Sequence, residues 1–337
     1  MITEAIKKLV DNENLTYDEA LTCMDEIFSG EVTEVQTASY LTALRIKGET
    51  VEEITASAKG MRNHAEQLLH EGMEVLEIVG TGGDCANSFN ISTTSGFVAA
   101  AAGVPVAKHG NRSVSSKCGA ADVLEALGAN ITISPEQSAQ VLQKCNFCFM
   151  FAQVYHKAMK YVAPVRKDLG IRTIFNILGP LTNPANASMQ LMGVYEEALV
   201  EPMAKVLSKL GVKNGMVVYG KDCLDEISLS APTTVCEIRD GELKTYTIQP
   251  EDFGFDKCDK EELVGGDSVE NAAITKAILS GEKGARRNAV VLNAAACIYI
   301  AKKADTLQEA VKIAEDMIDS GKASEVLNEY VTLTNAM

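Results

Sequence analysis

Short apolar runs alternate with alanine-rich runs through the middle of the chain, and this alternation constrains the fold most. MEVLEIVG (73–80), VPVA, ANITI, FCFMF, LMGV and MVVY have the length and side chains of buried strands. Between them, SGFVAAAAG and ADVLEALG have helical character. Strands that alternate with helices predict an α/β fold, in which helices flank a mostly parallel central sheet on both faces.

The two ends of the chain are predicted to be helical. Three capping boxes divide residues 1 to about 70 into short helices, and they pair Thr16 with Glu19, Thr33 with Gln36, and Thr50 with Glu53. The last seventy residues are amphipathic helix, and 233–252 is predicted to be an antiparallel ribbon around a turn at Asp240-Gly241. We therefore expect a small N-terminal helical domain (1–72) and a larger α/β domain (73–337).

Charge and composition narrow the class of protein. The formal net charge of −15 argues against a nucleic-acid partner, because phosphate backbones recruit basic surfaces. The charge-free stretch 96–107 is far shorter than a membrane span of about 18 residues, and the N-terminus does not resemble a signal peptide. Nine cysteines without such a signal are typical of free thiols, so we expect a cytoplasmic protein without membrane contact. Cys145 and Cys148 form a lone CxxC, which we interpret as part of a core strand.

A glycine-rich turn follows the first predicted strand. GTGGD (80–84) lets the backbone approach a ligand closely, although a plain tight turn is the alternative. NISTT (90–94) follows, where a helix is predicted to begin, and it supplies an amide and hydroxyls. A helix N-terminus with hydroxyl donors is suited to anions. These two segments together favour an anion site.

A second strand-to-helix loop concentrates positive charge. AKHGNRSVSS (107–116) carries Lys108, His109 and Arg112, with Lys117 directly after it. These cations could neutralise a phosphate, and arginine can make forked contacts. The alternative is a solvated basic loop, which is less expected between two buried elements of an acidic chain.

Two further segments stand beside predicted strands. LDEIS places Asp225 and Glu226 after MVVYG, at the carboxyl end of a strand, where their oxygens could hold Mg²⁺. Adjacent carboxylates on a wet surface are the alternative. The Gly-Pro and Asn-Pro steps of RTIFNILGPLTNP (172–184) predict fixed turns beside helices. Arg166 lies a few residues before this segment.

These segments jointly resemble the anthranilate phosphoribosyltransferase family, whose members join anthranilate to phosphoribosyl pyrophosphate (PRPP) in tryptophan biosynthesis. GTGGD, NIST, KHGNRSVSS, RTIFNILGPLTNP and LDE occur in the family's order over nearly the whole chain. The resemblance implies a helical domain hinged to an α/β domain, with a helical segment near 166–190 packing on the former, and a homodimer formed through the helices. It also implies Mg²⁺, in two ions, as the cofactor.

The resemblance assigns roles position by position. It places anthranilate against Gly80, Asn111 and Arg166, and magnesium on Ser92, Asp225 and Glu226. It places PRPP along Gly83, Asp84, Ser88, Asn90, Ile91, Ser92, Thr93, Lys108, His109, Gly110, Asn111, Arg112, Ser113, Val114, Ser115, Ser116 and Ala120.

The implied reaction gives N-(5-phosphoribosyl)anthranilate and pyrophosphate. Lys108 and Arg112 would act electrostatically on the leaving group. No general base is assigned, because an aryl amine already carries a free lone pair at neutral pH. Two alternatives stay open: a pyrimidine nucleoside phosphorylase, which shares the architecture, and a family member that keeps the fold without catalysing transfer.

Overall fold

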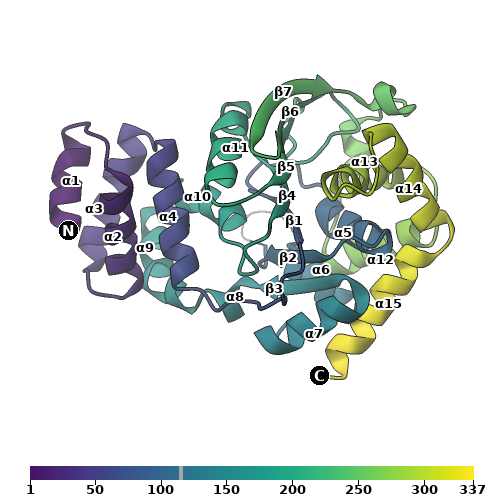
Figure 1. Cartoon of the computed structure of the whole chain (residues 1–337), viewed down its shortest axis with the longest axis horizontal. Coiled ribbons are helices and arrows are strands. Elements are labelled where there is room, and N and C mark those ends of the chain that lie inside the picture. Colours follow the sequence, from purple (N-terminus) through teal and green to yellow (C-terminus); the bar gives the residue numbers. More distant parts are fainter. Residues whose placement is uncertain (114–116) are drawn as a thin grey trace.

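The computed structural model describes residues 1–113 and 117–337 and is built around a seven-stranded sheet (Figure 1). The strand order is β3-β2-β1-β4-β5-β6-β7, with β1–β5 parallel and β6 and β7 antiparallel. The strands are β1 (Leu76–Gly80), β2 (Val106–Gly110), β3 (Phe147–Phe151), β4 (Met189–Gly193), β5 (Asn214–Gly220), β6 (Thr233–Arg239) and β7 (Glu242–Ile248). The predicted α/β fold with a mostly parallel sheet is confirmed, and β6 and β7 are the predicted ribbon.

One face of the sheet is covered by helices from the middle and the end of the chain. Ile78 of β1 packs in the same core as Phe97 of α5 and Leu292 of α13, all three almost fully buried. The helices of this domain are α5 (Ile91–Ala101), α6 (Ala120–Ala126), α7 (Pro135–Cys145), α11 (Val200–Lys209), α12 (Ser268–Leu279), α13 (Ala285–Ile300), α14 (Leu307–Asp319) and α15 (Lys322–Asn335). Of these, α11 lies on the opposite face and contacts β5 and β6.

The N-terminal bundle stands beside that opposite face (Figure 1). It comprises α1 (Ile2–Val10), α2 (Tyr17–Phe28), α3 (Glu34–Lys47) and α4 (Val51–Asn63). All three predicted capping boxes are present and begin α2, α3 and α4. The short helices α8 (Ala152–Tyr155), α9 (Ala163–Leu169) and α10 (Phe175–Leu178) return toward the bundle, and α9 contacts α3. The bundle core is continuous with α11, so the two parts share one apolar cluster.

Two local interpretations have different outcomes. The strand predicted at ANITI (129–133) is wrong: the segment is irregular, and its alternating Ile131 and Ile133 are buried in the core. The side chain of Asn130 accepts a hydrogen bond from the Thr132 backbone and closes a local turn that replaces strand pairing. The core-strand interpretation of the CxxC pair is correct for Cys148, which lies in β3, but not for Cys145, which ends α7; both are buried. Among the described residues, no helix is long and apolar enough to cross a membrane.

Candidate active site

The glycine-rich turn after β1 wraps around the carboxylate of Asp225. Gly82 and Gly83 have φ angles of +68° and +74°, a region that favours glycine. This conformation points the Gly82 N–H at Asp225 Oδ2, 2.7 Å away. The Asp225 N–H in turn faces Asp84 Oδ2 at 3.5 Å. The turn therefore brings the two aspartates of separate motifs together.

Glycines at the ends of two neighbouring strands make room for the LDE segment. Gly80 of β1 and Gly193 of β4 are register partners. A Cβ on Gly193 would overlap the backbone carbonyl of Asp225, and a Cβ on Gly80 would lie 2.7 Å from its Cγ. Only glycine at these two positions allows the backbone after β5 to fold across the carboxyl ends of β1 and β4.

Glu226 faces the N-terminus of α5. Its Oε1 accepts a hydrogen bond from the Ser92 N–H at 3.1 Å, so the carboxylate occupies an anion-binding helix end. Lys108 reaches the same point from β2, where its Nζ donates to Ser92 Oγ at 3.2 Å and to the Ile78 carbonyl at 2.6 Å. Lys108 is only 2% exposed, so its ammonium group is directed into the molecule beneath this helix end.

The two LDE carboxyl groups are buried close to other acids. Burial, and then the nearby charge of Asp84, raises the pKa of Asp225 to about 7. Burial, and then the charge of Asp225, raises the pKa of Glu226 to about 8, and Lys108 opposes that rise. The site thus concentrates carboxylate charge that its one buried cation does not balance.

This donor set fits a hard divalent cation that retains other ligands. Asp225 and Glu226 offer carboxylate oxygens, and Ser92 a hydroxyl, which are the oxygen donors that Mg²⁺ prefers. In the described part of the chain, no three histidine, cysteine, aspartate or glutamate side chains are grouped so as to hold a metal by themselves. Mg²⁺ usually binds through one or two carboxylates plus water and substrate phosphates. The carboxylates of Asp225 and Glu226 fit this mode of binding.

A buried polar network connects β2 to β1 and to the segment that precedes β4. Glu77, fully buried on β1, accepts a hydrogen bond from the His109 backbone at 3.1 Å and another from the Asn183 side chain. Asn183 also donates to the Ala107 carbonyl at 2.8 Å. Burial lowers the pKa of His109 well below its usual value, and its ring lies 4.9 Å from that of His156. Sequence reasoning missed Glu77, Asn183 and His156; the one available signal was a charged residue inside the apolar run LEIVG.

Arg112 lies beside α6. Its guanidinium contacts Glu125 and, at 3.1 Å, Asp122, and it lies 5.5 Å from the Phe151 ring. Asp122 also accepts hydrogen bonds from the Ser113 and Gly119 backbones. The basic loop is thus tied to the first turn of α6, and its arginine is paired with acids of its own domain.

Two arginines enter from the segment that packs on the bundle. Arg166 of α9 is half-buried, its guanidinium lies 5.4 Å from the Phe175 ring, and burial lowers its pKa. No acidic partner of Arg166 occurs among the described residues. Arg172, which sequence reasoning placed in a structural turn, donates to the Gly83 carbonyl at 2.8 Å and stacks 4.2 Å from the Tyr195 ring. Arg172 therefore connects the bundle side to the glycine-rich turn.

The remaining predicted positions lie at the ends of strands and helices or in the loops between them. Ile91 and Thr93 lie in the first turn of α5, and both are buried. Asn90 precedes α5 and accepts from Asn271 at 2.9 Å. Ser88 forms a bridge with Val264, Gly110 ends β2, Asn111 accepts from the Arg112 N–H, and Ala120 begins α6. Val114, Ser115 and Ser116 lie outside the described residues.

Comparison with known proteins defines the class of protein. Residues 72–324 match the a/b domain of a glycosyl transferase family, and residues 3–65 match the helical bundle domain of a glycosyl transferase family. The chain therefore has the two parts of a glycosyl transferase, a helical bundle domain and an a/b domain.

The individual relatives are named as one particular enzyme of this class. The anthranilate phosphoribosyltransferase of Lachnoclostridium phytofermentans is 66% identical over 335 residues, which are 99% of both chains. The solved structure of that enzyme from Thermus thermophilus has a TM-score of 0.93 at 43% identity and covers 98% of this chain and 99% of its own. The Saccharomyces cerevisiae enzyme, in complex with PRPP and Mg, has a TM-score of 0.91 at 28% identity, covering 100% and 98%. The chain belongs to the family of anthranilate phosphoribosyltransferases, and the family resemblance drawn from the sequence is confirmed.

Proposed function

We propose that the chain transfers the phosphoribosyl group of PRPP to the amine of anthranilate, giving N-(5-phosphoribosyl)anthranilate and pyrophosphate, as a step of tryptophan biosynthesis. The observation that carries this proposal is the convergence of the glycine-rich turn, the α5 N-terminus, Lys108 and the LDE carboxylates at one edge of the sheet. That edge combines anion-binding N–H groups with oxygen ligands for a divalent cation, which is what a magnesium pyrophosphate leaving group requires.

The chain's own residues would bind and orient PRPP. The N–H groups that begin α5 and the turn at 80–84 point to one edge, and Lys108 lies beneath them. Release of Arg112 from its acidic partners would allow it to reach a phosphate, because the pair is exposed and such pairs contribute about 1 kcal/mol or less. We retain Gly83, Asp84, Ser88, Asn90–Thr93, Lys108–Ser116 and Ala120 as the PRPP residues of this proposal.

Magnesium would be held by Asp225, Glu226 and Ser92. The cation, when bound, neutralises pyrophosphate charge and favours its departure. We propose two ions, since Asp84 adds a third carboxylate beside Asp225 and the donors spread over both the turn and the α5 N-terminus.

Anthranilate would be oriented by its carboxylate on Arg166, with Gly80 and Asn111 beside it. The absence of an acidic partner for Arg166 among the described residues leaves its guanidinium available for a forked contact. Positioning the amine in line with the breaking bond is the main task, and no general base is assigned.

The remaining proposals concern organisation. We propose domains at 1–72 and 73–337 and a cytoplasmic location. We also propose a homodimer through the bundle, supported by the exposed apolar side chains of Val35 and Ile46 on α3 and Val10 on α1.

The test follows anthranilate fluorescence with purified protein, PRPP and Mg²⁺. Loss of signal that requires both PRPP and the metal is the expected result. A parallel reaction with uridine and inorganic phosphate tests the nucleoside phosphorylase alternative. A flat anthranilate trace from folded protein would contradict the proposal, and uridine cleavage would replace it.

A further inference from the structure

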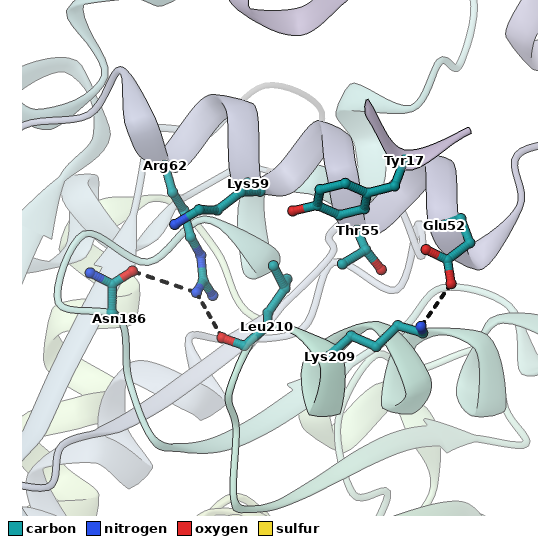
Figure 2. A pocket seen from close by; sticks show the side chains of 8 residues that line it. All are labelled: Tyr17, Glu52, Thr55, Lys59, Arg62, Asn186, Lys209 and Leu210. Atoms are coloured by element: carbon teal, nitrogen blue, oxygen red, sulfur yellow. Dashed lines mark hydrogen bonds and ion pairs between the residues drawn. The ribbon is translucent and has the colours of Figure 1, made fainter. Parts of the chain in front are cut away.

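A polar groove of about 580 Å³ lies between the bundle and the α/β domain (Figure 2). Tyr17, Glu52, Lys59 and Arg62 line it from α2 and α4, and Asn186 and Lys209 line it from the other side. None of the residues proposed above for PRPP, anthranilate or magnesium lines this groove. It is therefore separate from the candidate active site.

The groove concentrates positive charge in an acidic protein. It gathers Lys59, Arg62 and Lys209 around a single acid, Glu52, in a chain whose formal net charge is −15. Glu52 pairs with Lys209 at 2.7 Å, an exposed contact at the edge of the groove. Lys59 is exposed and makes no ion pair with a described residue.

Among the residues that line the groove, Arg62 most strongly indicates an anionic ligand. It is 7% exposed, and its guanidinium donates only to neutral oxygens: the Leu181 carbonyl at 2.8 Å, the Leu210 carbonyl at 3.3 Å and Asn186 Oδ1 at 3.5 Å. No described carboxylate pairs with it. Burial lowers the pKa of Arg62 to about 10, and the nearby charge of Glu77 only partly opposes that fall. Burying this cation is therefore costly, and a bound anion would reduce the cost.

We propose that this groove is a second anion-binding site, which takes a small phosphate- or carboxylate-bearing molecule with at least two negative charges. Lys59 and Lys209 reach the anion from opposite walls, and Arg62 meets it at the base. The buried charge of Arg62 and two flexible ammonium groups match such a ligand better than a monovalent one.

The site would join the two parts of the protein. Lys59 and Arg62 belong to the bundle, whereas Lys209 and Asn186 belong to the α/β domain, so one ligand contacts both. Arg62 also holds Leu181, two residues before Asn183, which supports β2 through Glu77. A ligand that binds only the docked arrangement stabilises it by mass action.

Isothermal titration calorimetry tests the proposal with inorganic phosphate and with citrate as separate probes, sodium acetate at equal ionic strength being the monovalent control. We compare the wild-type chain with K59Q/K209Q, with E52Q and with K205Q. Lys205 is the matched control, because it lies one turn from Lys209 on α11, pairs with Glu201, and has 53% side-chain exposure against 48%. Arg62 is left intact, since its loss could disturb folding.

The expected result has opposite signs in two variants. K59Q/K209Q should weaken phosphate or citrate binding about tenfold, whereas E52Q should strengthen it about threefold by removing the acid that lines the groove. K205Q should match the wild type. Phosphate bound at the candidate active site contributes equally to all four proteins, so isotherms that do not differ among them, or no binding beyond acetate, would overturn the proposal.

Hydrogen exchange gives a second readout that involves no enzyme activity. The anion should slow exchange in α4 and in residues 181–186 of the wild type but not of K59Q/K209Q. Equal slowing in both proteins would place the anion elsewhere and would also overturn the site.

Discussion

Substitution of Gly193 by alanine tests whether the close packing of LDE on the sheet positions the carboxylates. Gly193 ends β4, and a Cβ there would overlap the carbonyl carbon and oxygen of Asp225. Those are backbone atoms, so a side-chain rotation cannot relieve the overlap. The segment that carries Asp225 and Glu226 must move away from β1 and β4.

The size of the effect follows from that displacement. A shift on the order of 1 Å in a group that orients a reacting bond costs about 10²-fold in rate. The overpacked strand end should also lose about 1–3 kcal/mol of unfolding free energy. We therefore expect Gly193→Ala to remain folded, to lose about 10²-fold in kcat/KM for PRPP, and to require more Mg²⁺ for half-maximal activity.

The control is Gly215→Ala at the other end of neighbouring β5. Its Cβ would lie 2.6 Å from the Gln190 carbonyl oxygen, so it overpacks the sheet without touching Asp225. Urea unfolding and steady-state rates over a magnesium titration are measured for both variants. Comparable loss of stability with an unchanged Mg²⁺ requirement in both would refute the reasoning, because the effect would then be general strain.

Two further predictions concern charge at the site. Arg166→Ala should raise the KM for anthranilate about 10- to 150-fold, the worth of a charged hydrogen bond of about 1.5–3 kcal/mol, with kcat at saturation little changed; an unchanged KM would remove Arg166 from the anthranilate site. The second prediction concerns the pH dependence of stability when EDTA removes divalent cations. Burial raises the pKa of Asp225 to about 7 and that of Glu226 to about 8, whereas both are about 4 in unfolded chains. The folded state then binds more protons, so the melting temperature should fall as pH rises from about 4 to 8, and Mg²⁺ should oppose the fall. The slope should flatten in D225N/E226Q, and a slope that is identical in that variant would contradict this assignment.

The local elements of the fold could be predicted because their signals are local. Each threonine that caps a bundle helix lies three residues from its glutamate or glutamine partner. FCFMF forms β3 at its expected bounds, since a short, fully apolar run is typical of a strand that is covered on both faces. The strand prediction for ANITI was wrong because alternation alone does not distinguish a strand from a turn whose isoleucines pack into a neighbouring core.

The motifs of the candidate site could also be gathered from sequence, for a geometric reason. Carboxyl ends of parallel strands meet at one edge, so GTGGD after β1, KHGNR at β2 and LDE after β5 converge there. The directions of their side chains could not be predicted. Lys108 is directed inward to Ile78 and Ser92, and Arg112 pairs with Glu125, because partners fixed by packing decide where a long side chain goes.

The sequence by itself determined most element types, the mostly parallel sheet and the set of motifs, because capping, periodicity and glycine freedom act within a few residues. Only the tertiary structure decided which distant residues meet. Gly193 makes room for Asp225, Glu77 holds His109 and Asn183, and Arg62 reaches Leu181 across 119 positions of chain. Such contacts depend on how the bundle and the sheet pack against each other, and no local pattern records that packing.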